Sequence, residues 1–181
     1  QALISLGFLG NNILAGGHNG CLFIWKGTEL SRAVKLHEGS ISCIGPRYGE
    51  EGIVTGGTEG HVYVLDGSLK KVDSVNLRKL RSLAAKPRSV CEKQGKLLVG
   101  TRGGEVIEVE ARAAKVLMRG HFHKELWGLT KHPSEPLFAT VGEDSMLAVW
   151  ELLNCKQKNF CKVEGPANTL SYSSDGLQLS V

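Results

Sequence analysis

The sequence predicts an all-β protein, an incomplete β-propeller of about four and a half blades, each blade a four-stranded antiparallel sheet. Short runs rich in β-branched and aromatic residues recur along the 181 residues, separated by glycine, asparagine, aspartate or serine. Four of these runs end at equivalent positions, Trp25, Leu65, Val109 and Trp150, which lie 40, 44 and 41 residues apart. Many of the 23 glycines fall at the breaks, where tight hairpins need positive φ angles.

The clearest copy of the repeat covers residues 120–151. It begins with Gly120-His121, has a turn at Asp144 and ends with Trp150-Glu151. A period of roughly 40–45 residues with a Gly-His start and a Trp-acid end is the signature of WD-type propeller blades. We therefore expect a binding surface rather than a catalyst.

The predicted strands follow one order in each blade. The first three blades have strands near Leu3–Phe8, Asn12–Ala15 and Cys21–Trp25, then Ser40–Ile44, Ile53–Thr55 and His61–Leu65, then Val90–Cys91, Leu97–Val99 and Glu105–Val109. The fourth has Leu126–Thr130, Leu137–Thr140 and Met146–Trp150, and the fifth begins with Thr169–Ser173 and Leu177–Val181. Outer strands are expected before the later blades, for instance at Ser31–Lys35 and Lys115–Met118. A short helix over Leu77–Lys86, ended by Pro87, is the alternative for that segment.

The period divides residues 1–152 into consecutive blades of one propeller. The approximate boundaries are 1–30, 31–69, 70–114 and 115–152. Residues 153–181 start a further blade, possibly of a second propeller. Because a blade cut between strands leaves an unpaired sheet edge, we expect the chain to be a fragment of a longer protein.

A buried polar network is predicted in the fourth blade from His121, Thr140, Asp144 and Trp150. Asp144 would accept backbone and imidazole N–H groups, and His121 would connect it to the Thr140 hydroxyl. The other blades are degenerate in this set. The first has Ala15, Asn19 and Trp25, the second has His37, Thr55, Glu59 and Leu65, and the third has Gly103 and Val109 at the aspartate and tryptophan positions. A fully satisfied buried network favours one unique packing.

The fourth blade also resembles a particular family. The string Gly120-His121-x-x-x-Glu125-Leu126-Trp127-Gly128-Leu129-x-x-His132-Pro133-x-x-Pro136 is similar to a blade of the echinoderm microtubule-associated protein-like (EMAP-like) family. Arg88-Ser89-Val90-Cys91 with Leu97-Leu98-Val99-Gly100-Thr101 is similar to its preceding blade. The run Phe8-Leu9-Gly10-Asn11 with Gly16-Gly17 and Ile24-Trp25 resembles a blade further back.

The resemblance implies a tandem pair of propellers and a non-catalytic scaffold that binds tubulin, microtubules or other cytoskeletal partners. It implies a location in the cytoplasm, at the cytoskeleton. The family's N-terminal coiled coil and hydrophobic linker motif do not occur in these residues, which puts direct microtubule binding by them in doubt. A general WD-repeat adaptor in another intracellular complex is the alternative.

A basic stretch supplies the candidate partner-binding residues, Lys79, Arg81, Lys86 and Arg88. The net charge of the chain is +4, and tubulin presents an acidic surface, which a basic loop could attract at low salt. The other interpretation is a solvated connector. No aromatic residue interleaves these cations, so nucleic acid is not an expected partner.

Other chemistries find little support. The histidines at 121, 123 and 132 lack a third ligand at a tested metal-site spacing, and the glycine-rich turns precede neither a helix nor Lys-Ser/Thr. We therefore expect no cofactor, no metal, no catalytic residue and no small-molecule substrate. No apolar run is long enough for a membrane span. The five cysteines are dispersed and odd in number, which indicates reduced thiols in an intracellular protein.

Overall fold

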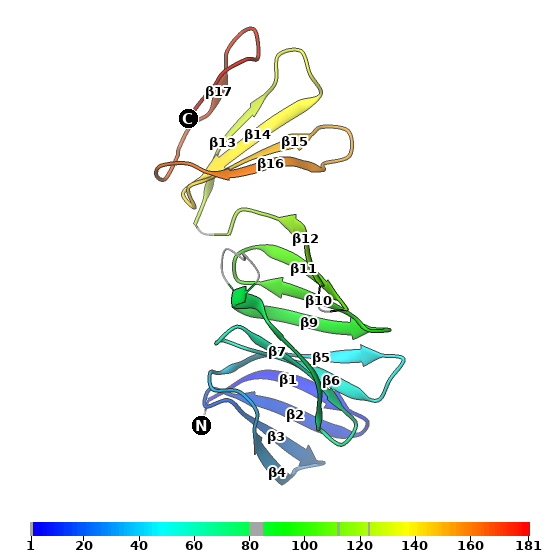
Figure 1. Cartoon of the computed structure of the whole chain (residues 1–181). Coiled ribbons are helices and arrows are strands. Elements are labelled where there is room, and N and C mark those ends of the chain that lie inside the picture. Colours follow the sequence, from blue (N-terminus) through cyan, green and yellow to red (C-terminus); the bar gives the residue numbers. More distant parts are fainter. Residues whose placement is uncertain (1, 80–84, 112, 123) are drawn as a thin grey trace. The chain divides into compact units, whose positions relative to one another are not determined.

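The computed structural model describes residues 2–79, 85–111, 113–122 and 124–181 (Figure 1). Its strands confirm the predicted fold class, an incomplete propeller of four-stranded antiparallel blades. The chain divides into a first unit, Gln1–Leu117, and a second unit, Met118–Val181, and each is described by itself. Of the alternative helix at 77–86, the structure shows one 3-10 turn, η1 (Leu77–Lys79), while residues 80–84 lie outside the described part.

The first unit holds three blades, each a meander with its strands in sequence order. The first blade comprises β1 (Leu3–Leu9), β2 (Asn12–Gly17), β3 (Cys21–Lys26) and β4 (Glu29–Lys35). The second comprises β5 (Ile41–Tyr48), β6 (Gly52–Gly57), β7 (His61–Asp66) and β8 (Lys71–Asn76). The third comprises β9 (Pro87–Lys93), β10 (Lys96–Thr101), β11 (Glu105–Glu110) and β12 (Ala113–Arg119).

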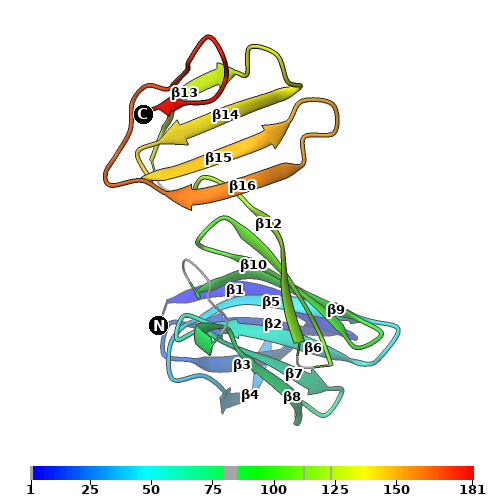
Figure 2. The ribbon, with the colours of Figure 1, turned by 45° about the horizontal axis from the view of Figure 1, so that its top comes forward.

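The hydrophobic core lies between the blades (Figure 2). One cluster joins the first and second blades and consists of Leu14, Leu22, Ile24, Leu36, Ile41, Ile53 and Leu65. The other joins the second and third blades and consists of Cys43, Val54, Val62, Val64, Leu77, Val90, Leu97, Val99, Ile107 and Val109. The near-continuous apolar run of β6 is explained by this arrangement, because this middle strand of the second blade lies between the two clusters and is covered on both faces.

The second and third blades are joined at their first strands. The end of β5 pairs in parallel with β9, Arg47 opposite Glu92, so the two blades share one eight-stranded sheet. Arg47 Nε donates to Glu92 Oε2 at 2.8 Å, and the other oxygen of this buried carboxylate accepts the Gly95 N–H at 2.6 Å. A buried ion pair with both partners satisfied fixes the alignment of the two strands more than it adds stability.

The boundaries of the sequence repeat are offset by one strand from the boundaries of the blades. The outer strands expected at 31–35 and 115–118 are formed, but they lie within β4 and β12, which pair with β3 and β11 of the preceding blade. Each outer strand thus opens a sequence period and completes the sheet before it. The reason is local, since a short turn such as the one at Gly27 returns the chain directly to the edge of the strand just formed.

The second unit contains one complete blade, β13 (Leu126–Lys131), β14 (Leu137–Gly142), β15 (Met146–Glu151) and β16 (Gln157–Lys162). It is followed by the hairpin β17 (Ser171–Tyr172) and β18 (Leu179–Ser180), where the fifth blade was expected to begin. Ala139, Val141, Ala167 and Leu170 form the core of this unit. His132 connects the blade to the β17–β18 hairpin, because its Nε2 lies 3.2 Å from the carbonyl oxygen of Gly176 in the turn of that hairpin.

Candidate functional site: a histidine network and a basic surface

The structure brings together all four predicted members of the network in the fourth blade. The Trp150 Nε1–H donates to Thr140 Oγ1 at 2.8 Å, and Thr140 Oγ1 lies 3.0 Å from His121 Nε2. His121 Nδ1 lies 3.0 and 2.9 Å from the two carboxylate oxygens of Asp144. The hydrogen-bond partners assign the tautomer of His121. The Asp144 carboxylate can only accept, so the proton lies on His121 Nδ1, and the Thr140 hydroxyl donates to His121 Nε2.

Asp144 also organises the backbone around it. Its Oδ1 accepts the Met146 N–H at 3.1 Å, closing a turn onto its own chain, and its Oδ2 accepts the Phe122 N–H at 3.1 Å. The Asp144 side chain is 1% exposed. The carboxylate therefore serves three N–H donors from the segment before β13 and from the β14–β15 turn. Removing it would take the acceptor from all three donors, of which the Met146 and His121 groups are partly buried.

The second blade builds a related network from different residues. His37 Nδ1 lies 2.5 Å from Glu59 Oε1, and His37 Nε2 lies 2.9 Å from Thr55 Oγ1. Glu59 Oε2 accepts the Gly39 N–H at 3.1 Å, so the longer carboxylate takes over two of the contacts that Asp144 makes. Burial lowers the pKa of His37, and the hydrogen bond that His37 donates to the Glu59 carboxylate opposes this only in part.

The second network has no donor equivalent to the Trp150 indole N–H of the fourth blade. Leu65 pairs with Ile53 as Trp150 pairs with Phe138, and leucine has no N–H to give. The Tyr63 ring instead packs beside His37 with 4.4 Å between ring centroids, and Lys71 Nζ lies 3.4 Å from the centre of the Tyr63 ring. The sequence repeat gave no sign of Tyr63 or Lys71, because neither occupies a position of the WD pattern.

The first and third blades retain only parts of the pattern. In the first, Asn19 Oδ1 accepts the Cys21 N–H at 3.2 Å, which keeps the turn contact of the missing aspartate. In the third, Thr101 Oγ1 accepts the Gly103 N–H at 3.2 Å. These bonds close hairpin turns inside one blade and connect no histidine to the sheet.

Three of the four predicted partner-binding residues lie in the described part, and Arg81 lies outside it. Lys79 ends η1, Lys86 precedes β9 and Arg88 lies in β9, all with exposed side chains. The Arg102 N–H donates to the Lys86 carbonyl at 2.8 Å, which adds an exposed arginine that the sequence did not suggest. We define Lys79, Lys86, Arg88 and Arg102 as the basic surface. Among the described residues, none of these four forms an ion pair.

A register irregularity near the start of β9 takes Arg88 out of the regular pairing with β10. Pairing between β9 and β10 passes from Ser89 opposite Gly100 to Pro87 opposite Thr101, so Arg88 is skipped. Ile4 in β1 and Ser42 in β5 are skipped in the same way. Such bulges redirect a side chain out of the regular alternation. At this position the Ser42 hydroxyl donates a hydrogen bond to the Pro87 carbonyl oxygen, whereas the Arg88 side chain is exposed to solvent.

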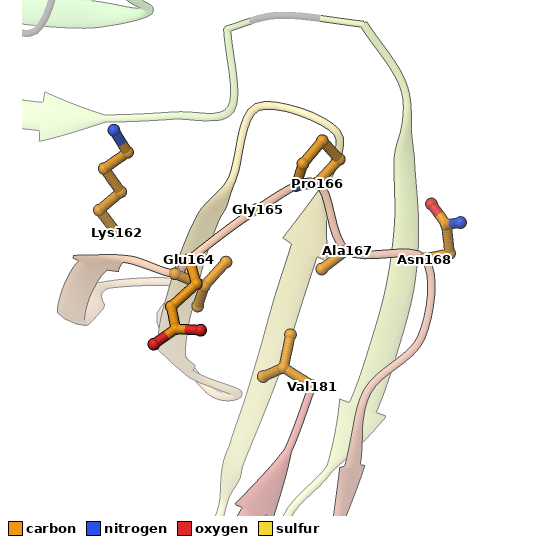
Figure 3. Close-up of a pocket in the computed structure, with 8 residues that line it drawn as sticks. Lys162, Glu164, Gly165, Pro166, Ala167, Asn168 and Val181 are labelled. Atoms are coloured by element: carbon orange, nitrogen blue, oxygen red, sulfur yellow. The ribbon is translucent and has the colours of Figure 1, made fainter.

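Grooves of similar volume lie in the described parts of both units. In the second unit, a groove of about 490 Å³ is lined by Lys162, Glu164, Pro166, Asn168 and Val181 with their neighbours. Figure 3 shows that the polar side chains of Lys162, Glu164 and Asn168 point in different directions rather than at a common centre. In the first unit, a groove of about 500 Å³ runs past His61, Asp73 and Lys79 to Val109.

In residues 2–79, 85–111, 113–122 and 124–181, no group of three or more His, Cys, Asp or Glu side chains is placed to hold a metal ion. Of the three histidines considered in the sequence, His123 lies outside the described residues. No described helix has the length and apolar character needed to cross a bilayer. All five cysteines are free thiols.

Comparison with known proteins identifies the class of this fold. The family model for the WD domain, G-beta repeat, matches residues 114–151. A chain in the crystal structure of the mitotic checkpoint complex superposes with a TM-score of 0.52 at 15% identity, covering 94% of this chain and 54% of that chain. The protein is a WD-repeat β-propeller segment.

The relatives define the segment more narrowly. A ciliary WD repeat-containing protein, ctxp80 of Euplotoides octocarinatus, is 29% identical over 84% of this chain. Echinoderm microtubule-associated protein-like 2 of Mus musculus is 25% identical over 95%, and the 77 kDa echinoderm microtubule-associated protein of Strongylocentrotus purpuratus is 28% identical over 82%. The resemblance to the EMAP-like family that the sequence motifs predicted is confirmed by these relatives. The chain spans between 20% and 27% of the length of these relatives.

Proposed function

We propose that this segment is part of a non-catalytic protein-binding scaffold in a microtubule-associated protein. The observation that carries the proposal is the similarity to echinoderm microtubule-associated protein-like 2 over 95% of the chain. The partners we propose are tubulin, microtubules or proteins bound to them, and the location is the cytoplasm, at the cytoskeleton. Propeller blades of the WD type suit this role, because their rigid sheets hold loops and bulges in fixed positions for a partner.

The surface we propose for partner binding is the basic surface. Its four cations lie on loops and a bulge at the margin of the second and third blades rather than in their core. Exposed cations that are not already paired within the protein are available to an acidic partner, and they raise the rate of association at low salt. Arg81 belongs to the same stretch of sequence and is included in this proposal.

The test is co-sedimentation of the full-length protein with microtubules after reversing the charges of Lys86, Arg88 and Arg102 to glutamate. We expect binding about tenfold weaker at low ionic strength, with a smaller difference as salt is raised. Lys93→Glu is the matched control, because Lys93 is exposed on the same strand as Arg88 but roughly 17 Å further along it. Equal affinity and equal salt dependence of the triple variant and the control would remove the basic surface from the proposal. Absence of microtubule binding by the unaltered protein would remove the proposal itself.

A further inference from the structure

The outer strands of the second and fourth blades carry the same local hydrogen bond. β8 and β16 are each the last strand of a sheet, and among the strands that the structure describes nothing pairs with their outer sides (Figure 2). In β8, the Ser74 N–H donates to Oδ1 of the preceding Asp73 at 2.7 Å. In β16, the Phe160 N–H donates to Oδ1 of the preceding Asn159 at 2.8 Å. We call Asp73 and Asn159 the edge caps.

The edge caps lie at the same place in the repeat. Asp73 and Asn159 each pair with the valine that precedes the tryptophan position of the repeat. In both outer strands a register irregularity skips the residue directly before the cap, Val72 in β8 and Lys158 in β16. Such a bulge bends the strand and turns the following side chain out of the regular alternation, which allows its oxygen to reach the next N–H.

The two capped N–H groups point away from the sheet. In an antiparallel ladder, only every second residue of an edge strand directs its N–H to the neighbouring strand. The Leu77 N–H donates at 2.9 Å to the residue before β7, and the Val163 N–H donates at 2.9 Å to the residue before β15. Ser74 and Phe160 each lie three residues before these inward donors, and the pairing over these residues is regular. Because three is odd, their N–H groups face outward, where an added strand would have to bond them.

The first blade provides a reference without a cap. Arg32 in β4 occupies the position of the edge caps, since it follows the residue that is skipped between β3 and β4. The next N–H, that of Ala33, also faces outward, because the inward donor Leu36 again lies three residues further on. A guanidinium only donates, so Arg32 cannot accept this N–H. The edge of β4 therefore lacks the acceptor that the preceding residue supplies in β8 and β16.

We propose that the edge caps close β8 and β16 to strand addition by a second copy of this chain. An unpaired edge is a template for pairing with another chain, and a second copy always presents an edge strand of equal length. The cap occupies the outward N–H, so an incoming carbonyl oxygen gains a bond only where the cap loses one. Asp73 also repels that oxygen through its charge, whereas Asn159 acts through its amide oxygen alone. The inference concerns sheet edges and does not depend on what the protein binds.

The first test measures the caps by residue-resolved hydrogen exchange of the full-length protein, with quench-flow labelling and mass spectrometry. After correction for intrinsic rates, we expect the Ser74 and Phe160 N–H groups to exchange at least about tenfold more slowly than the Ala33 N–H. Asp73→Asn should keep the protection of Ser74, because its amide oxygen still accepts, and Asp73→Ala should remove it. Equal rates at the three positions overturn the proposal. Protection that Asp73→Asn abolishes also overturns it, because the charge and not the bond would then be responsible.

The second test asks whether the caps prevent association. Sedimentation velocity of the full-length protein is compared with that of the double variant Asp73→Ala, Asn159→Ala. We expect the double variant to form dimers or larger species at a protein concentration at least about tenfold lower. Arg32→Ala is the matched control, because it shortens an exposed side chain at the same register position without removing a cap. This control should associate no more than the unaltered protein does.

Three outcomes of the second test contradict the proposal. One is unchanged association of the double variant, and another is association of Arg32→Ala at an equally low concentration. The third is association of the double variant without slower exchange at Ser74 or Phe160, which would place the contact on another surface. Exchange of β6 and β14 should stay unchanged as the folding control, since both substituted side chains are exposed. The comparison of Ser74 with Ala33 in the unaltered protein decides the proposal if a variant fails to fold.

Discussion

The second and fourth blades each hold a histidine between a carboxylate and a threonine hydroxyl, but they do so with different residues. In the fourth, an aspartate holds its own turn and the histidine, and a tryptophan supplies an N–H to the threonine. In the second, Glu59 reaches the histidine and a backbone N–H, and a tyrosine packs on the imidazole. What both retain is a carboxylate on Nδ1 and a threonine hydroxyl on Nε2. The histidine–hydroxyl–carboxylate core is therefore the part that these two networks share, and the tryptophan is the part that the second network replaces.

The two carboxylates also differ in burial. The Asp144 side chain is 1% exposed and the Glu59 side chain 20%, so water can reach Glu59 when a bond is lost. The fourth blade accordingly depends more on its complete set of bonds than the second does. Three experiments test the comparison between the two networks, beginning with the one expected to have the largest effect.

Asp144→Ala should destabilise the second unit by about 3 kcal/mol, because three N–H donors lose the buried carboxylate that accepts from them. Peptide-resolved hydrogen exchange of β14 and β15 measures the loss locally. Glu143→Ala is the control, since the neighbouring Glu143 forms an exposed ion pair with Lys124 and should change stability by no more than about 0.5 kcal/mol. If the two variants exchange alike, the network does not stabilise the blade.

Protonation of His37 should have a smaller effect, at most about 1.4 kcal/mol for each pH unit. Because burial holds the pKa of His37 below its value of 6.5 in the unfolded chain, the unfolded state binds more protons in the interval between the two pKa values. The stability of the first unit should thus be complete above pH 6.5 and fall as the pH drops toward the lowered pKa.

The measurement is the urea midpoint of the first unit between pH 7.5 and pH 5.5, with and without His37→Gln. The variant should lose stability at pH 7.5 and show a shallower pH dependence than the parent. A dependence that is equally steep in both proteins would assign the titration to another group.

The contact between Lys71 and Tyr63 should contribute least, about 0.5 kcal/mol, because the lysine is exposed. A double-mutant cycle with Lys71→Met and Tyr63→Leu separates this contact from the packing of each side chain. A coupling energy near zero would mean that Tyr63 substitutes for the tryptophan through its packing on His37 alone.

Much of the fold and of the fourth network could be predicted because the repeat places its residues at fixed intervals. His121, Thr140, Asp144 and Trp150 are recognisable from spacing alone, and so are the middle strands. The roles of Tyr63, Lys71 and Ser42 could not be predicted in this way, because they depend on the strand register and on the bulge at each first strand. Arg102 was missed for a similar reason, since only the turn geometry brings it beside Lys86.

The one-strand offset between period and sheet has a consequence for how such proteins lengthen. A duplicated period carries the closing strand of the sheet before it and the first three strands of the sheet after it. The first strand of an extra copy inserted between two periods pairs with the free edge of the preceding sheet. The last strand of the copy then presents an equivalent edge to the period that follows. Every blade then keeps four strands whatever the number of copies, so gene duplication can add blades without an intermediate form that exposes an unpaired edge.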